Sequence, residues 1–377
     1  MNLYLFGDNL KVLRFIKRNL VFCIAALAAI ITCFLVPPDK EYLGYFDFKT
    51  LSCLFLTLAV VCALRNIKFF TILARKLVAI ACNLRSLFLM LIIITFIGSM
   101  IIANDMALIT FLPLGYYALS VTQQEKYMAY LFVLQNVSAN LGGMLTPFGN
   151  PQNLYLYSYF KIPTGEFCSI LLPLFLIAVL LLIIACIPIS AVKFSLNCEF
   201  KEKLNVKKAV LYCALFLFSI LIVFRIVPFV IGLLLVPIIL FFVEREALKM
   251  VDYALIGTFF FFFIFAGNLA RLESVNLIIS SLLKRDTLIT SILSCQFISN
   301  VPSAILLSRF TNDYPSLLLG VNIGGTGTLI ASLASLITFN EFKILYPNKV
   351  KKYLSTFAVV NVVFLVVLTI AAKLIIK

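Results

Sequence analysis

Long apolar runs constrain this chain more strongly than any other feature of its sequence. A transmembrane helix needs about 20 apolar residues, and runs near that length recur along the chain. Hydrophobic residues make up 63% of the chain and charged residues 12%, against roughly 45–50% and 25% in soluble domains. This composition excludes a soluble enzyme and a disordered chain, and it predicts an all-α polytopic membrane protein. The clearest candidate spans are 20–36, 50–64, 168–192, 209–227, 228–243, 253–270 and 353–376.

The net charge of +15 comes from basic residues in short loops between apolar runs. That distribution is a topology signal rather than a nucleic-acid-binding surface, so we expect no nucleic-acid partner. With the N-terminus in the cytoplasm, the segments placed inside hold 21 Lys and Arg and 8 Asp and Glu, while the rest of the chain holds 10 and 8. We therefore expect a multi-pass protein of the inner (plasma) membrane. The segments placed inside are the N-terminus, 65–86, 120–126, 193–208, 244–252 and 341–352.

This charge count requires two stretches that turn back within the membrane. Residues of about 87–119 must enter and leave on the cytoplasmic side, and residues of about 287–310 on the outer side. The predicted fold then has about nine full spans plus two opposed re-entrant hairpins. Such a fold is an inverted-topology repeat with broken helices at the midplane.

The two expected repeats divide the chain into similar halves. The first repeat, 1–208, contains a broken helix at about 124–160. The second, 209–377, begins with a linking helix and contains a broken helix at about 315–340. Segment 65–86 mixes cations with apolar residues at helical spacing, which is typical of an interfacial helix.

A short polar motif occurs twice, each time where an apolar run is interrupted. Glycines of this kind can simply allow close helix packing. Their recurrence together with Asn and Thr in the same order favours an unwound binding site, as in transporters with discontinuous helices. The matching positions are Asn140, Gly142, Gly143 and Thr146 in one copy and Asn322, Gly324, Gly325 and Thr328 in the other.

Non-helical backbone is tolerated in a membrane only where protein buries it or it lines a wet cavity. The hairpin tips and helix breaks are therefore expected to meet near the midplane, where Asn104 and Asn300 cap half-helices. Unwound carbonyls can bind Na⁺, and half-helix N-termini attract anions. The candidate binding residues are Asn104, Asp105, Asn140, Gly142, Gly143, Thr146, Asn150, Asn153, Ser299, Asn300, Asn322, Gly324, Gly325 and Thr328. Further polar side chains near the breaks are Ser99, Asn136, Ser138, Gln152, Gln296, Thr326 and Ser332.

Asp105 is the one acidic residue that this topology places deep in the membrane. A buried charge there is costly, so it is a functional hypothesis by default. It can carry a proton, bind a cation or neutralise an arginine such as Arg309. The alternative is a hairpin tip that reaches cytoplasmic water, with Asp105 solvated.

Four segments resemble the ion transporter superfamily, most closely its citrate-transporter-like and arsenical-pump-like bacterial inner-membrane permeases. They are NDMALITFLPL (104–114), SANLGGMLTPFGNPQNL (138–154), CQFISNVPSAILL (295–307) and GVNIGGTGTLIASLASLI (320–337). The resemblance implies inverted repeats, opposed hairpins, an elevator motion and Na⁺- or H⁺-coupled movement of anions or small oxyacids. In the divalent-anion/sodium relatives both tips read Ser-Asn-Thr. Here residues 103–105 read Ala-Asn-Asp and 299–301 read Ser-Asn-Val, and the Asn-Asp pair looks like the arsenical-pump branch.

The expected function is secondary active transport of a small anion or oxyacid. The alternatives are a membrane channel, a Na⁺/H⁺ exchanger and a membrane-embedded enzyme. The chain has no histidine, so it lacks the HExxH motif of intramembrane metalloproteases, and it has no Walker motif for ATP. We expect no enzyme activity and no cofactor. The coupling ion is Na⁺ or H⁺, with Asn104 and Asn300 considered for Na⁺, and the expected partners are the solute, membrane lipid and, in a homodimer, a second copy.

Overall fold

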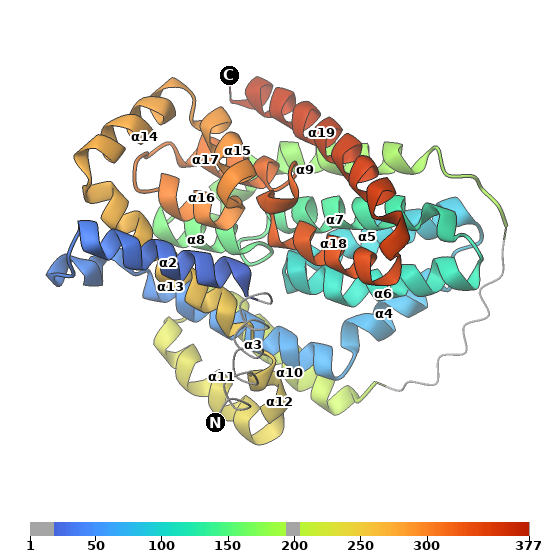
Figure 1. Ribbon diagram of the computed structural model, residues 1–377. Coiled ribbons are helices and arrows are strands. Elements are labelled where there is room, and N and C mark those ends of the chain that lie inside the picture. The colour runs from blue at the N-terminus through green and yellow to red at the C-terminus, as the bar shows by residue number, and fades with distance from the viewer. Residues whose placement is uncertain (1–18, 194–203, 377) are drawn as a thin grey trace, which may run out of the picture.

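The computed structural model describes residues 19–193 and 204–376, and every regular element in these residues is a helix (Figure 1). Six of them are long and apolar enough to cross a membrane: Phe48–Asn66, Leu84–Ile102, Thr164–Cys186, Val206–Val223, Tyr253–Arg271 and Pro347–Ile375. Three shorter apolar helices, Leu20–Leu35, Phe229–Val243 and Thr287–Ile298, accompany them. The predicted all-α polytopic membrane fold is confirmed.

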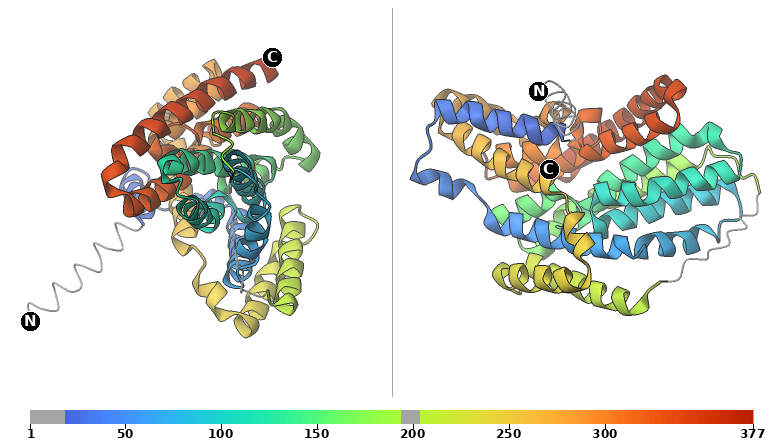
Figure 2. Two further views of the ribbon diagram at one scale, coloured as in Figure 1. Left: turned by 90° about the vertical axis from the view of Figure 1, so that its right-hand side faces the viewer. Right: turned by 60° about the horizontal axis from the view of Figure 1, so that its bottom comes forward.

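The helices follow the predicted spans closely. Helices from the two parts of the chain also pack together, since α2 lies along α13 (Figure 2). The first part contains α2 (Leu20–Leu35), η1 (Lys40–Tyr45), α3 (Phe48–Asn66), α4 (Phe69–Val78), α5 (Leu84–Ile102), α6 (Asn104–Val121), η2 (Glu125–Tyr127), α7 (Met128–Gly142), η3 (Gly143–Leu145), α8 (Pro151–Tyr159) and α9 (Thr164–Cys186). The second part contains α10 (Val206–Val223), α11 (Phe229–Val243), α12 (Arg245–Lys249), α13 (Tyr253–Arg271), α14 (Glu273–Arg285), α15 (Thr287–Ile298), α16 (Asn300–Leu307), α17 (Tyr314–Gly324), η4 (Leu329–Ala331), α18 (Leu333–Leu345), η5 (Pro347–Lys349) and α19 (Val350–Ile375).

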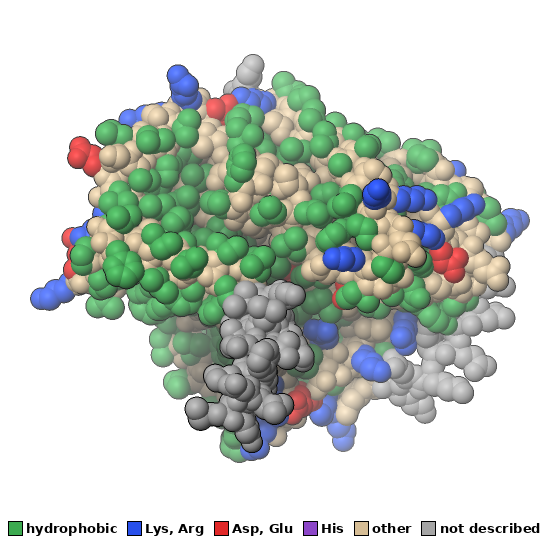
Figure 3. Space-filling model, viewed as in Figure 1, with side chains coloured by type: hydrophobic (Ala, Val, Ile, Leu, Met, Phe, Trp, Pro, Cys, Tyr) green, Lys and Arg blue, Asp and Glu red, His purple; other side chains and the backbone are tan. Residues whose placement is uncertain are grey.

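Large apolar side chains face outward on α2, α9, α11 and α19, and hydrophobic side chains cover much of the face in Figure 3. Phe34 is 83% exposed and Phe242 is 79% exposed. Exposed rings of this size are unfavourable in water and favourable against lipid. The expected interfacial segment forms α4, whose Phe70, Ala74 and Val78 are buried on one face.

One side of the molecule collects the segments that the charge count places in the cytoplasm, and we call it the basic side. Glu244 accepts hydrogen bonds from Asn66 (2.7 Å) and Lys208 (2.7 Å), which joins the ends of α3, α10 and α11. The start of α5 joins the segment after α9, because the Leu84 amide donates to the Val192 carbonyl (3.0 Å).

Two further contacts complete the basic side. The Tyr127 and Ser190 hydroxyls lie 3.4 Å apart, and the Lys352 ammonium donates to the Lys126 carbonyl (3.4 Å). The starts of α5 and α19 and the segments after α6 and α9 therefore lie together at this side.

The other ends of the helices meet at the opposite side. Arg271 pairs with Asp39 at 2.7 Å, and this hydrogen bond holds the pKa of Asp39 below its usual value. Arg309, just after α16, donates to the Tyr45 carbonyl, and Tyr314 donates to Glu166.

The two hairpins enter the fold from these two different sides. The hairpin α5–α6 begins and ends at the basic side, with its turn at Ala103. The hairpin α15–α16 turns at Ser299 and has its ends at the opposite side, where Asp286 pairs with Lys373 and Arg309 contacts Tyr45. Although α5 has the length and hydropathy of a span, its last residue is followed by a reversal.

The arrangement of the loops makes a labelling prediction. Lys126 and Lys161 are both exposed and lie at the two ends of the α7–α8 broken helix. In a cysteine-free background, Lys126→Cys is expected to react with an impermeant maleimide from the cytoplasmic side and Lys161→Cys from the outer side. Labelling of both from one side would contradict the hairpin topology.

Candidate functional site

Both hairpin tips have the same strained backbone. Ala103 (φ 65°) and Ser299 (φ 76°) lie in the positive-φ region that non-glycine residues avoid. Strain of this kind costs about 1–3 kcal/mol and persists where the surroundings enforce it, often at functional sites.

The predicted N-caps of the two half-helices are wrong by one position. Ala103 and Ser299 hold the N-cap positions, and Asn104 and Asn300 are the first helical residues. Each Asn Oδ1 accepts a hydrogen bond from the next backbone N–H at 2.9 Å. The side chains therefore still occupy one free donor at each helix start.

The two motif threonines fasten the unwound stretches to the hairpins. Thr146 donates to the carbonyl of Met100, three residues before the first tip (2.7 Å), and Thr328 donates to the carbonyl of Gln296, three residues before the second tip (3.1 Å). Because these hydroxyls satisfy backbone carbonyls at matching places, we assign both threonines a structural role.

The first glycine of each motif lies against its hairpin. A Cβ on Gly142 would lie 2.2 Å from the Phe96 carbonyl oxygen and 2.5 Å from Ser99 Oγ. A Cβ on Gly324 would lie 2.7 Å from Cys295. Cys295 is four residues before the tip residue Ser299, just as Ser99 is four residues before the tip residue Ala103. These contacts are those of closely packed helices.

The second glycine of each motif lies beside an amide side chain. A Cβ on Gly143 would lie 2.4 Å from Asn150 Oδ1, and one on Gly325 would lie 3.1 Å from Asn300 Nδ2. These glycines leave space at the helix breaks for the amides to approach the backbone.

A set of buried side chains joins the breaks, and we call Asn104, Asn140, Asn150, Asn322 and Ser332 the polar junction. Asn140 Oδ1 accepts hydrogen bonds from Asn104 Nδ2 (3.2 Å) and Ser332 Oγ (2.7 Å). Asn150 Nδ2 donates to the Asn140 carbonyl (3.0 Å) and approaches Asn322 Oδ1 (3.4 Å).

Asn153 and Ser299 extend the junction on its two sides. Asn322 donates to Asn153 Oδ1 (2.7 Å), and Asn153 donates to the Met144 carbonyl (3.0 Å). Ser299 Oγ donates to the carbonyl of Ala331, directly before Ser332 (3.3 Å). Thus both hairpin tips connect to the same unwound stretch before α18.

Four helix N-termini converge on this junction. The starts of α6, α8, α16 and α18 are reached through the contacts of Asn104, Asn150, Ser299 and Ser332. The backbone N–H of Asn104 also donates to the carbonyl of Gly149, the residue directly before the α8 cap (3.2 Å). Each N-terminus brings a partial positive charge to this place.

Several polar atoms of α7 and of the start of α8 are buried without a hydrogen-bond partner in residues 19–193 and 204–376. They are Asn136 Oδ1, Ser138 Oγ, Asn140 Nδ2, Asn150 Oδ1 and Gln152 Oε1. A buried orphan of this kind costs about 1–3 kcal/mol, and native structures contain few of them. The two that belong to the polar junction, Asn140 Nδ2 and Asn150 Oδ1, indicate a place there for a polar solute, an ion or water.

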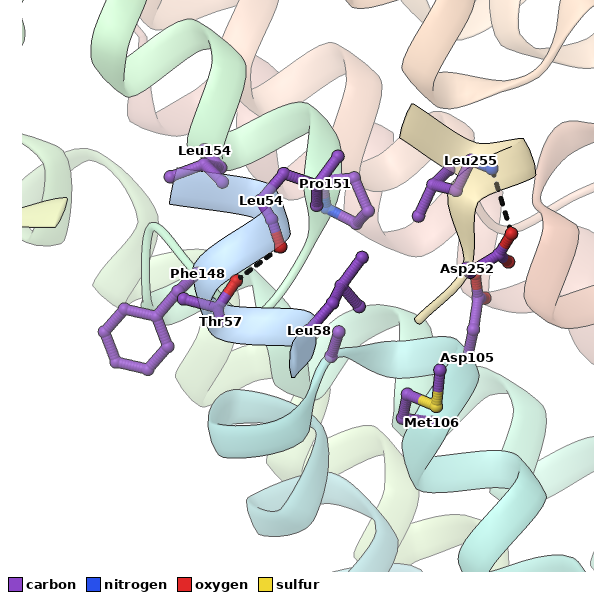
Figure 4. Close-up of a pocket in the computed structure, with 11 residues that line it drawn as sticks. Leu54, Thr57, Leu58, Asp105, Met106, Phe148, Pro151, Leu154, Asp252 and Leu255 are labelled. Atoms are coloured by element: carbon purple, nitrogen blue, oxygen red, sulfur yellow. Dashed lines mark hydrogen bonds between the residues drawn. The ribbon is translucent and has the colours of Figure 1, made fainter. Parts of the chain in front are cut away.

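Asp105 lines a small cavity of about 30 Å³ that is partly open to the surface (Figure 4). Its Oδ1 is shielded from solvent, so it is not a freely solvated tip residue. Asp252, which the charge count assigns to a loop, lines the same cavity. Arg309 lies at the opposite side, with its guanidinium over the Tyr159 ring, and does not line this cavity.

The fold and junction define a class of protein: a polytopic membrane protein with two opposed hairpins and two broken helices around a buried polar centre. The profile of the citrate transporter family matches residues 10–313, and the chain belongs to that family. It is 32% identical over 330 residues to an uncharacterized transporter of Methanocaldococcus jannaschii, covering 87% of this chain and 90% of the relative. It is 28% identical over 342 residues to the inner membrane protein YbiR of Escherichia coli, covering 87% and 89%. The protein is a membrane transporter.

The glycine contacts make a stability prediction. Gly142→Ala is expected to force the first hairpin away from α7, because the new Cβ meets a backbone oxygen. Overpacking of about 1–3 kcal/mol corresponds to a melting temperature lower by about 1–4 °C for a chain of this length. Gly165→Ala is the matched control, since nothing lies within 4 Å of its Cβ. Equal melting temperatures in detergent for the two variants would contradict the close packing.

Proposed function

We propose that the protein is a secondary active transporter that moves a small anion or oxyacid across the cytoplasmic membrane, coupled to H⁺ or Na⁺. The observation that supports this best is the polar junction, where four helix N-termini and unpartnered polar atoms meet inside apolar protein. No ATP-binding motif accompanies it in the sequence, so an ion gradient is the expected energy source.

The chemistry of the junction favours an anion as the solute. Its side chains are amides and hydroxyls, which donate hydrogen bonds without repelling negative charge. Helix N-termini add partial positive charge, and anions commonly bind at such ends. Unwound carbonyls near Asn104 and Asn300 offer an alternative for Na⁺, as in transporters with discontinuous helices.

We infer that alternating access is an elevator motion of the hairpins and broken helices against the other helices. The matching contacts of Thr146 with Thr328, and of Gly142 with Gly324, support an inverted-repeat relation between 1–208 and 209–377. In such transporters one unit moves around a midplane site. The loop charge count predicts about nine crossings besides the hairpins.

The proposed orientation places the basic side and the N-terminus in the cytoplasm, by the positive-inside rule. The E. coli relative is named as an inner membrane protein, which supports the same membrane for this chain. A homodimer stays a prediction, and so does the choice of coupling ion. A channel or a Na⁺/H⁺ exchanger would be the conclusion if solute flux needed no gradient or if only cations moved.

The test is uptake into proteoliposomes with labelled citrate, succinate, phosphate, sulfate and arsenite, each under a separate Na⁺ or H⁺ gradient. Accumulation of one solute against its gradient, dependent on one ion, is the expected result. Flux of every solute only down its own gradient would reject secondary active transport.

A second prediction concerns the hairpin-tip amides. Asn104→Ala and Asn300→Ala should each lower the uptake rate of the transported solute at least about tenfold, the effect of losing about 1.4 kcal/mol of interaction. Expression and melting temperature should change little. Asn276→Ala is the control, because Asn276 is exposed on α14 and its side chain bonds only near neighbours in sequence, the Ala270 carbonyl and the Ser280 hydroxyl. Normal uptake by both tip variants would mean that the tips serve packing alone.

A further inference from the structure

The cavity beside Asp105 lies where the first hairpin meets the helices around it. The hairpin tip contributes Ala103, Asp105 and Met106, and α3, the start of α8 and the α12–α13 turn form the remaining walls. The walls are mostly apolar. Figure 4 shows the Asp105 side chain reaching up to Asp252 at one edge of the cavity.

The Asp105 carboxyl group lacks a partner here. Its Oδ1 is buried and accepts no hydrogen bond from any described residue. Asp252 Oδ1 caps α13 by accepting from the Leu255 N–H (2.9 Å). The Thr57 hydroxyl, also in the wall, donates to carbonyls of its own helix, Cys53 at 2.9 Å and Leu54 at 3.1 Å. Two neighbouring carboxyl groups without a donor between them need a positive charge or a shared proton.

No lysine or arginine lines this cavity among the described residues. Arg65 on α3 approaches its edge, with Nη1 3.9 Å from Met106 Sδ. The charged residues of the other helices packed on α6 lie outside the wall: Arg75 and Lys76 on α4, Arg85 on α5, Glu125 and Lys126 on η2, and Glu341 and Lys343 on α18. Asp105 and Asp252 are therefore the only ionisable side chains of the described wall, and in their ionised forms they attract a small cation and repel an anion.

We propose that Asp105 and Asp252 together bind one monovalent cation, H⁺ or Na⁺, and that this cavity is the coupling-ion site. The role as coupling ion rests on the proposed transport function, whereas cation binding itself does not. Asp252 is the new member of the site, and it belongs to a helix start outside both hairpins and both broken helices.

The position of the cavity explains how a cation can influence the solute. Asn104 and Asp105 are neighbours on the first turn of α6, yet the Asn104 side chain bonds Asn140 in the polar junction and Asp105 lines the cavity with Asp252. A cation that bridges the carboxylates fixes the hairpin tip against α13. The same fixation holds Asn104 at the junction, so each ligand favours the tip position that the other needs.

Thermal unfolding of the purified full-length protein in detergent tests the site without knowledge of the solute. A ligand that binds only the folded state raises its melting temperature. If the cation is Na⁺, replacing choline chloride with NaCl at fixed pH should raise the wild-type value by about 2 °C or more. If it is H⁺, the rise should instead follow a decrease in pH at fixed salt.

Asp252→Asn and Asp105→Asn should each abolish most of that rise. Asn keeps the N-cap hydrogen bond of Asp252, so α13 should still form. The matched control is Asp313→Asn, because Asp313 caps α17 through the Ser316 N–H (3.2 Å) and is exposed. It should keep the full response. A wild-type protein that responds to neither ion, or Asp252 and Asp105 variants that keep the wild-type response, would overturn the proposal.

Transport separates the two proposals. With citrate as probe, both Asp variants should lose at least about tenfold of gradient-driven accumulation, while citrate exchange at equal ion concentrations survives. Accumulation that is unchanged in both variants would remove the coupling role from this cavity. If the wild type moves neither citrate nor another tested anion, the transport proposal fails, and the unfolding measurements still decide cation binding.

Discussion

The need to satisfy backbone polar groups inside apolar protein governs this fold. An unpaired N–H or C=O at membrane depth costs several kcal/mol, so helix breaks there must be mutually compensating. Thr146 bonds the Met100 carbonyl, Thr328 bonds the Gln296 carbonyl, and Asn150 bonds the Asn140 carbonyl. Hairpins and broken helices therefore have to lie together, because each supplies partners that the other lacks.

That constraint also produces the binding chemistry. Bringing four breaks together necessarily brings together the helix starts that follow them, and with them their partial positive charge. The strained residues Ala103 and Ser299 redirect the chain so that α6 and α16 begin there. Once the backbone carbonyls are satisfied, some buried side-chain donors and acceptors, such as Asn140 Nδ2 and Asn150 Oδ1, have no hydrogen-bond partner among the described residues. A polar solute is the natural partner for them.

Much of this architecture could be predicted because its signals are local in sequence. Apolar run length predicted the helices within a few residues, and Pro228 indeed stands at the start of α11. The side-chain partners were not predictable, because amides and hydroxyls have several donors and acceptors that only folding pairs. Asp252 was missed for a different reason: its place at the end of a charged loop suggested water, whereas the α12–α13 turn directs it against Asp105.

Comparison of the two motif copies separates scaffold from chemistry. The contacts of the motif threonines and of the first motif glycines recur at the same number of residues before each tip. These contacts therefore belong to the scaffold that the two copies share. The amides do not recur in this way: Asn104 bonds Asn140, whereas Asn300 lies over Gly325 and Asn322 bonds Asn153 instead. Only the first tip carries an acid, since position 301 is Val where 105 is Asp. In the proposed transport mechanism, the similar scaffold contacts would permit exchange between two facing states, and the different tips would let the solute and the coupling cation occupy different places.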